Sequence, residues 1–202
     1  SRRKFLDQIN GTFINAVAVP LKETDGHVYI PGVARARDLG TALTAIPDPG
    51  ALVADIHARG LMAIARIVIF KDNTLARKHP ELAVRRPDGS LWRNRAGIAW
   101  VDPYRREIWE YNLDLAIAAA RLGFDEIQFD YIRFPSDGKI DLCRYSRADH
   151  DKKTAAKNIH AFLAYAKERL KPQGVKISVC LFGLTATDDT GMGIGQHIGA
   201  LT

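Results

Sequence analysis

Short apolar runs rich in β-branched residues alternate along the chain with longer stretches in which apolar residues recur at helical spacing. Four of the runs predict β-strands, at residues 13–21, 61–70, 124–134 and 175–183. Each run is largely apolar on both faces, which is typical of parallel strands covered on both sides. Pro20 lacks a backbone N–H and is expected to end the first strand.

The stretches around these strands carry the start and stop signals of helices. Helices are expected over residues 1–10, 48–60, 102–123 and 149–174, and from about residue 196 onward. Asp48 and Asp102 are the expected N-caps of two of them, each followed by a proline, because an aspartate side chain accepts from the free N–H groups of the first turn. The alternation of helix and strand predicts an α/β fold with a parallel sheet.

The long irregular segments of the chain all follow predicted strands. They cover residues 71–101, after the second strand, and residues 135–150, after the third. Long loops in compact domains are uncommon unless they bind a ligand or cover a site. Because α/β folds build their sites at the carboxyl ends of the strands, this placement indicates function there.

The composition is that of one ordinary globular domain, with 47% hydrophobic and 26% charged residues. Lys and Arg number 29 against 23 acidic residues, a net charge of +6, so a polyanionic partner is compatible with the chain, as is a simply solvated basic surface. The two cysteines, Cys143 and Cys180, have no spacing typical of a zinc site or a disulfide framework. No apolar stretch approaches the roughly 20 residues that span a bilayer.

The third predicted strand has two distinct faces, because side chains alternate along a strand. One face carries Glu126, Gln128, Asp130 and Ile132, and the other carries Ile127, Phe129 and Tyr131, which are expected to pack beneath helices. A carboxylate in an apolar strand requires a cationic or hydrogen-bonding partner, and Arg66, alone in the apolar second strand, has the same requirement. We expect neighbouring strands to pair Asp130 with Arg66, as an internal ion pair or as part of a catalytic group.

Further carboxylates follow the other predicted strands. Glu23 follows the first strand, Asp72 the second, and Asp188 and Asp189 the fourth. Glycoside hydrolysis requires two carboxyl groups on either side of the scissile bond, so each of these residues is a candidate second carboxyl beside Asp130. The chain has neither the glycine-rich dinucleotide motif nor the phosphate-binding P-loop motif.

The loop after the second strand is both basic and aromatic. It contains Arg77, Lys78, Arg85, Arg86, Arg93 and Arg95 together with Trp92 and Trp100. Aromatic faces stack on sugar rings or bases, and guanidinium groups bind carboxylates or phosphates, so this loop is the expected partner-binding segment. The alternative is a cap on the domain whose tryptophans belong to the core.

Three segments resemble one known family: "ARIVIFKDNTLARKHPELAVRRPDGSLW", "GFDEIQFDYIRFPSDG" and "FGLTATDDTGMGIGQ". They are similar to the glycosyl hydrolase domain family of bacteria and archaea, a (β/α)₈ barrel of largely undefined substrate, and the similarity runs through essentially the whole chain. The resemblance implies that residues 1–202 form a single, partial barrel domain that lacks the first strand and the last three. It places Asp130 at the end of the fourth barrel strand, where related retaining glycosidases carry a nucleophile, and matches Lys71 and Arg133 to polar positions of the family motif.

Two positions depart from the family pattern. Pro20 and Cys180 stand where the family usually has aspartates, on its second and fifth strands. If the fifth-strand carboxylate is the general acid, this chain has lost it, so the departures bear on activity more than on fold.

The first functional hypothesis is a glycoside hydrolase that cleaves O-glycosidic bonds in a polysaccharide or oligosaccharide. Acidic saccharides are among the expected substrates. Asp130 would be the nucleophile or stabilising carboxylate, and Asp72, Glu23, Asp188 or Asp189 would supply the acid. The residues expected to bind substrate or to hold Asp130 ionised are Arg66, Lys71, Trp92, Trp100, Gln128 and Arg133. The mechanism requires no metal or organic cofactor, and the resemblance favours an exported or cell-envelope protein.

Two other hypotheses compete with this one. A catalytically degenerate barrel would bind a polysaccharide without cleaving it, having lost its acid at Cys180. A nucleic-acid-binding protein is compatible with the charge alone, since no recognised nucleic-acid motif accompanies the basic residues.

Overall fold

The structure is a computed structural model that describes residues 2–187 and 191–196. Its strands are β1 (Ala16–Lys22), β2 (Met62–Val68), β3 (Glu126–Asp130) and β4 (Lys176–Val179). Its α-helices are α1 (Arg2–Ile9), α2 (Ala34–Asp38), α3 (Pro49–His57), α4 (Asn73–Lys78), α5 (Arg106–Arg121) and α6 (Lys152–Leu170). Short 3₁₀ turns are η1 (Pro80–Leu82), η2 (Ile140–Leu142), η3 (Lys171–Gln173), η4 (Gly183–Ala186) and η5 (Gly191–Gly193).

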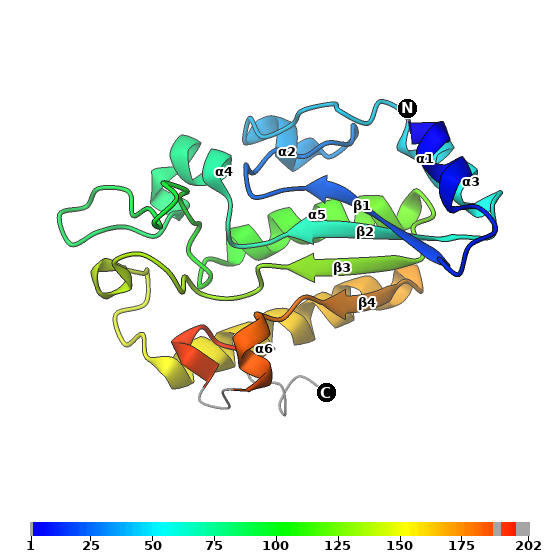
Figure 1. Cartoon of the computed structure of the whole chain (residues 1–202). Helices are drawn as coiled ribbons and strands as arrows, with labels where there is room; N and C mark the ends of the chain where they lie inside the picture. Colours follow the sequence, from blue (N-terminus) through cyan, green and yellow to red (C-terminus); the bar gives the residue numbers. More distant parts are fainter. Residues whose placement is uncertain (1, 188–190, 197–202) are drawn as a thin grey trace.

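The four strands form one parallel sheet in the order β1-β2-β3-β4, which confirms the predicted α/β class (Figure 1). Each predicted strand is present, although β3 and β4 are shorter than expected. The register aligns Pro20, Arg66, Gln128 and Ser178 as neighbours across the sheet. These four side chains therefore share one face, as alternation requires.

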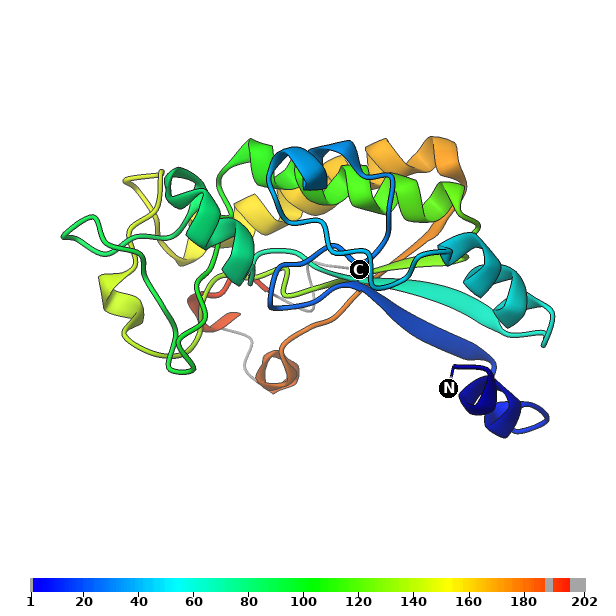
Figure 2. The ribbon, with the colours of Figure 1, turned by 90° about the horizontal axis from the view of Figure 1, so that it is seen from above.

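The two faces of the sheet differ in their cover. Helices α2, α5 and α6 lie together on one face, as Figure 2 shows from above. On that face the sheet presents Val19, Ala65 and Ile127, all buried, whereas the residues that alternate with them on the other face are partly or fully exposed. The sheet is therefore amphipathic, with an apolar helix side and a polar open side.

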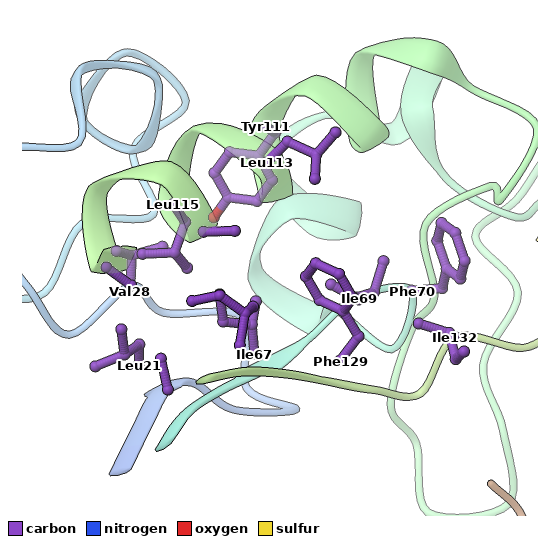
Figure 3. Close-up of a cluster of buried hydrophobic side chains, with 14 of the residues drawn as sticks. Leu21, Val28, Ile67, Ile69, Phe70, Tyr111, Leu113, Leu115, Phe129 and Ile132 are labelled. Carbon is purple, nitrogen blue, oxygen red and sulfur yellow. The ribbon is translucent and has the colours of Figure 1, made fainter. Parts of the chain in front are cut away.

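The hydrophobic core lies between the sheet and α5 and α6. Figure 3 shows Tyr111 and Leu115 of α5 above Ile67 of β2 and Phe129 of β3. The stripe predicted for α5, formed by Ile108, Tyr111, Leu115 and Ala119, is entirely buried. On α6, Phe162 stands with its ring 5.7 Å from that of Phe129 and 5.5 Å from that of Phe70.

The ends of β1 and β3 differ from the prediction. Pro20 does not end β1, which shifts register between Pro20 and Lys22 and continues to Lys22. Since β1 pairs only with β2 in the described sheet, and the shift is an irregularity of the ladder, the missing N–H is tolerated there. Strand β3 ends at Asp130 because Tyr131 has a φ of +51°, so the regular alternation stops there, although the partly buried Tyr131 side chain still packs against the core.

One of the two predicted N-caps is confirmed. Asp48 accepts a hydrogen bond from Ala51 N at 2.8 Å and caps α3. Asp102 is not a cap, because α5 begins at Arg106; its carboxylate accepts from Tyr104 N at 3.0 Å and Ser146 N at 2.6 Å instead, which joins two loops.

The helix expected from about residue 196 lies outside the described residues. Among the helices that the structure describes, none combines the length and the apolar character that a bilayer crossing demands.

Replacing Phe162 by Ala should destabilise the protein by about 3–5 kcal/mol, because the substitution removes a fully buried ring that contacts rings from β3 and α5. Urea unfolding followed by circular dichroism measures this free energy. The exposed Lys157 on the same helix is the control, and its Ala variant should change stability by less than about 0.5 kcal/mol. Equal effects at the two positions would contradict the described packing of α6.

Candidate functional site

The loops that follow β2 and β3 extend together beyond the carboxyl ends of the strands (Figure 1). The backbones of Arg85 and Arg144 exchange two hydrogen bonds, of 3.0 and 2.7 Å, between these loops. Trp92 Nε1 donates to Lys139 O at 2.8 Å, which joins the same loops a second time. The long loops predicted at the carboxyl ends of the strands are therefore present, and hydrogen bonds connect them.

At this edge, Arg66 of β2 binds two carboxylates on the open face. Its Nε and Nη2 donate to Asp130 Oδ2 at 3.0 and 2.6 Å, which confirms the predicted pairing of β2 with β3. Its Nη1 donates to Glu23 Oε1, just after β1. One guanidinium thus links groups from three consecutive strands.

All three side chains of this cluster are partly open to solvent. The exposed fractions are 24% for Arg66, 18% for Asp130 and 34% for Glu23. Because Nε and Nη2 of the guanidinium bind Asp130 while Nη1 binds Glu23, one planar cation holds the two carboxylates close together. Burial lowers the pKa of Arg66, but the hydrogen bonds and charges of Asp130 and Glu23 outweigh it and raise that pKa overall.

The second oxygen of Asp130 is also held in place. Tyr131 N donates to Asp130 Oδ1 at 2.7 Å. Tyr131 has a left-handed backbone, a conformation that costs an L-residue about 1–2 kcal/mol and that is enriched at functional sites. Both carboxylate oxygens are therefore oriented before any ligand binds.

Cys180 follows β4 beside this cluster. Its backbone N donates to Phe129 O at 2.9 Å, which continues the pairing of β3 with β4. Burial and the negative charge of Asp130 raise the pKa of the Cys180 thiol, against the opposite effect of Arg66. The residue at this position is thus a neutral thiol near Asp130.

Asp72 lies in the interior, away from the open face. Its side chain is fully buried, with Oδ2 2.7 Å from Lys22 Nζ and Oδ1 accepting from Leu75 N as the N-cap of α4. Lys22 is also fully buried and donates to Asn112 Oδ1 of α5 at 2.8 Å. Burial lowers the pKa of the Lys22 ammonium, although the charge of Asp72 acts in the opposite direction.

The two loop tryptophans are core residues. Trp92 is 1% exposed and Trp100 is fully buried, so neither presents an open face to a sugar ring. Trp100 contacts the ring of Tyr131 edge to face, with centroids 5.9 Å apart. This agrees with the alternative in which the loop caps the domain and its tryptophans belong to the core.

The cations near Tyr131 stack on aromatic rings. Lys71 Nζ lies 4.7 Å from the Tyr131 ring centroid. Arg133, nine-tenths buried, lies over the rings of Trp100, Tyr131 and Phe182 and donates to Ser136 Oγ at 2.8 Å. Arg133 thus makes no direct ion pair with Asp130 in the described structure, in contrast to the expectation, and burial lowers its pKa.

Three further candidate residues lie on β3 or follow β4 in the sequence. Gln128 is partly buried on the open face, beside Arg66 in the register. Asp188 and Asp189 lie outside the described residues. In the part of the chain that the structure describes, no group of three or more His, Cys, Asp or Glu side chains is arranged to hold a metal ion.

Sequence reasoning missed the contact of Glu23 with Arg66, the burial of Lys22 and the backbone of Tyr131. Glu23 could have been found from the register, since it follows the strand beside Arg66. The single lysine at the end of an apolar strand and the aspartate after the next strand are a weak signal of the Lys22–Asp72 pair. No sequence signal indicates the positive φ of Tyr131.

A family model described as "Putative glycosyl hydrolase domain" matches residues 1–202. The chain belongs to this family. A similar solved structure is that of a hypothetical protein from Ruminiclostridium thermocellum ATCC 27405, which is 35% identical with a TM-score of 0.79. The similarity covers 90% of this chain and 91% of that one. None of the curated proteins matches the chain.

Structures of glycosidases resemble this family member at lower identity. The α-galactosidase TtGalA from Thermus thermophilus is 18% identical with a TM-score of 0.57, over 88% of this chain and 33% of that one. A β-N-acetylhexosaminidase is 17% identical with a TM-score of 0.62, over 92% of this chain and 44% of that one. The chain thus spans a third to under half of these two enzymes, and what it shares with them is the fold.

The buried pair of Lys22 and Asp72 can be tested by a double-mutant cycle. Asp72→Ala should cost about 3–5 kcal/mol, because it leaves a buried ammonium without its counter-charge. The double variant Lys22→Met/Asp72→Ala should be more stable than Asp72→Ala alone, since the unpaired charge is then gone. Unfolding free energies of the four proteins measure this, and additive effects would show that the two charges do not interact.

The backbone of Tyr131 allows a second test. Tyr131→Gly should be more stable than Tyr131→Ala by about 1 kcal/mol, because only glycine adopts a positive φ without a steric penalty. Both variants lose the ring, so their comparison isolates the backbone. Chemical denaturation of the two proteins gives the difference; a more stable Ala variant would mean that residue 131 does not need the left-handed conformation.

Proposed function

We propose that this family member is a glycoside hydrolase that cleaves O-glycosidic bonds in a polysaccharide or oligosaccharide, with Asp130 as the nucleophile or stabilising carboxylate. The observation that carries the proposal is the position of Asp130. It lies at the carboxyl end of an inner strand, on the open face of the sheet, with both oxygens oriented. A site at this edge is where parallel α/β enzymes place their chemistry.

The four-stranded sheet is proposed to be an arc of a (β/α)₈ barrel that forms one domain over residues 1–202. Its helices cover one face only, and its other face carries the row of Pro20, Arg66, Gln128 and Ser178. In a closed barrel that row would point inward. The likeness to parts of glycosidase structures supports this arrangement.

The chemistry assigned to Asp130 requires an ionised carboxylate that is aimed at the sugar. Arg66 supplies the positive charge and donates two hydrogen bonds to Oδ2. The other carboxylate oxygen, Oδ1, accepts from Tyr131 N. As nucleophile, Asp130 would attack the anomeric carbon and form a glycosyl ester, which water then hydrolyses. As stabilising carboxylate it would face the positive charge that develops on the ring.

Glu23 is the proposed second carboxyl group among the described residues. It is the most exposed member of the cluster, and Arg66 binds it together with Asp130, so that two carboxyl groups lie at one site, as glycoside hydrolysis requires. Asp72 is left out of the proposal because it is buried against Lys22. Lys71 and Gln128, both partly exposed beside the cluster, are proposed to contact substrate hydroxyl groups.

The neutral thiol of Cys180 supports a second candidate function, a barrel that binds a polysaccharide without cleaving it. A thiol whose pKa is raised by burial and by Asp130 is a much weaker acid than a carboxyl group, so it is a poor replacement for one as general acid. The two functions differ in product release, which the following experiment measures.

Asp130→Asn should lower the release of reducing ends from a cleaved polysaccharide by at least about a thousandfold, because an amide neither attacks nor stabilises the anomeric centre. Glu23→Gln should lower it by about a hundredfold or more if Glu23 is the acid or base. A panel of neutral and acidic polysaccharides identifies the substrate first.

The matched control is Glu126→Gln, a carboxylate on the same face of the same strand that is hydrogen-bonded to Ser178. This variant should keep its activity. Full activity of Asp130→Asn would sink the assignment of Asp130, and binding without any product release by the unchanged protein would favour the binding barrel.

A further inference from the structure

The loops beyond β2 and β3 enclose a second feature, a hollow of about 380 Å³ that the carboxylate cluster does not use. Four exposed cations line it, and they come from two segments: Arg86, Arg93 and Arg95 after β2, and Lys139 after β3. The loop pairing described above brings these segments together. The loops that line it extend beyond the carboxyl ends of the strands (Figure 1), the edge at which β3 ends with Asp130.

Within the described residues, none of these four cations forms a salt bridge with a carboxylate. Two carboxylates that belong to the same loops are engaged with other donors. Asp88 accepts from Ser90 N and Oγ at 2.9 and 2.6 Å, and Asp137 accepts from Asn94 Nδ2 at 3.4 Å. The hollow therefore gathers positive charge that the described part of the protein leaves without ion-pair partners.

The walls of the hollow are fixed before a ligand arrives. Trp92 Nε1 is bonded to Lys139 O, and Asn94, which is buried, accepts from Ile98 N at 2.9 Å. Gly138 sits so close to the other loop that an added Cβ would lie 3.1 Å from Arg95 N. A preformed site loses less conformational entropy on binding, so ordered loops favour a specific ligand over diffuse attraction.

We propose that this hollow is a subsite for an anionic group on a glycan, a carboxylate or a sulfate of a sugar unit that extends from the bond held at Asp130. The inference rests on the proposed function and adds a substrate class to it. Guanidinium groups bind such anions through paired charge-assisted hydrogen bonds. A single-stranded nucleic acid is disfavoured because its binding depends on open aromatic faces, and Trp92, the one aromatic residue that lines this hollow, is buried.

The proposal is tested by binding rather than by turnover. Affinity electrophoresis of the full chain, at about 150 mM salt to screen diffuse attraction, compares polygalacturonate with its methyl ester and dextran sulfate with dextran. A single-stranded DNA oligonucleotide forms a fifth arm. At least one anionic polysaccharide should bind about tenfold or more tightly than its neutral counterpart, and the two anionic arms distinguish a carboxylate from a sulfate.

The variants Arg93→Gln/Arg95→Gln and Lys139→Gln should each lower that affinity by about tenfold or more, because each removes charge-assisted contacts. Lys139→Gln leaves the backbone carbonyl that Trp92 binds. The matched control for the double variant is Arg37→Gln/Arg121→Gln, which removes the same two charges at exposed positions of α2 and α5 and should bind as the unchanged protein does.

Any of four results would overturn the proposal. Two concern the ligands: neutral and anionic polymers bind equally, or neither anionic polysaccharide binds. The others are an equal loss of affinity in the control variant and tightest binding of DNA. Asp130→Asn should keep the preference for the anionic polymer over its neutral counterpart. Loss of anion selectivity with turnover intact therefore rejects the subsite alone, and absence of turnover with anion selectivity intact rejects the hydrolase alone.

Discussion

The Arg66 guanidinium is the interaction on which the open edge of the sheet depends. It stands on β2 and binds Asp130 at the end of β3 and Glu23 after β1, so it fixes three strand ends relative to one another. Two neighbouring carboxylates repel each other unless a cation stands between them. Their closeness, and with it any chemistry that uses both, therefore follows from one positive charge placed in an otherwise apolar strand.

The placement of that charge follows from the amphipathic sheet, and this part of the structure was predictable from the sequence. Strand alternation puts Arg66, Gln128 and Asp130 on the face opposite Ile127 and Phe129, and the structure has them so. The pairing of Arg66 with Asp130 was predictable because each group alone is costly in such surroundings. Local signals were also sufficient for Asp48, whose cap requires only residues within one turn.

Other contacts between residues distant in the sequence were not predicted. The sequence carries only a weak signal that Lys22 is buried with Asp72, 50 residues away in the chain, and none that the Trp92 indole binds the Lys139 carbonyl. Pro20 was wrongly expected to end β1 because the prediction ignored that the strand pairs on one side only in the described sheet and shifts its register. Tyr131 leaves the strand through a backbone conformation that its side chain does not favour, so its position depends on contacts that only the folded chain provides.

The hydrogen bonds between the loops after β2 and β3 affect how the carboxyl edge of the sheet opens. Backbone hydrogen bonds between Arg85 and Arg144 resemble a short stretch of sheet, and the indole bond to Lys139 reinforces them. Segments joined in this way exchange their amide protons as one cooperative unit rather than as two independent loops. Opening of either loop would consequently break the hydrogen bonds that order the other, so the two loops open and close together.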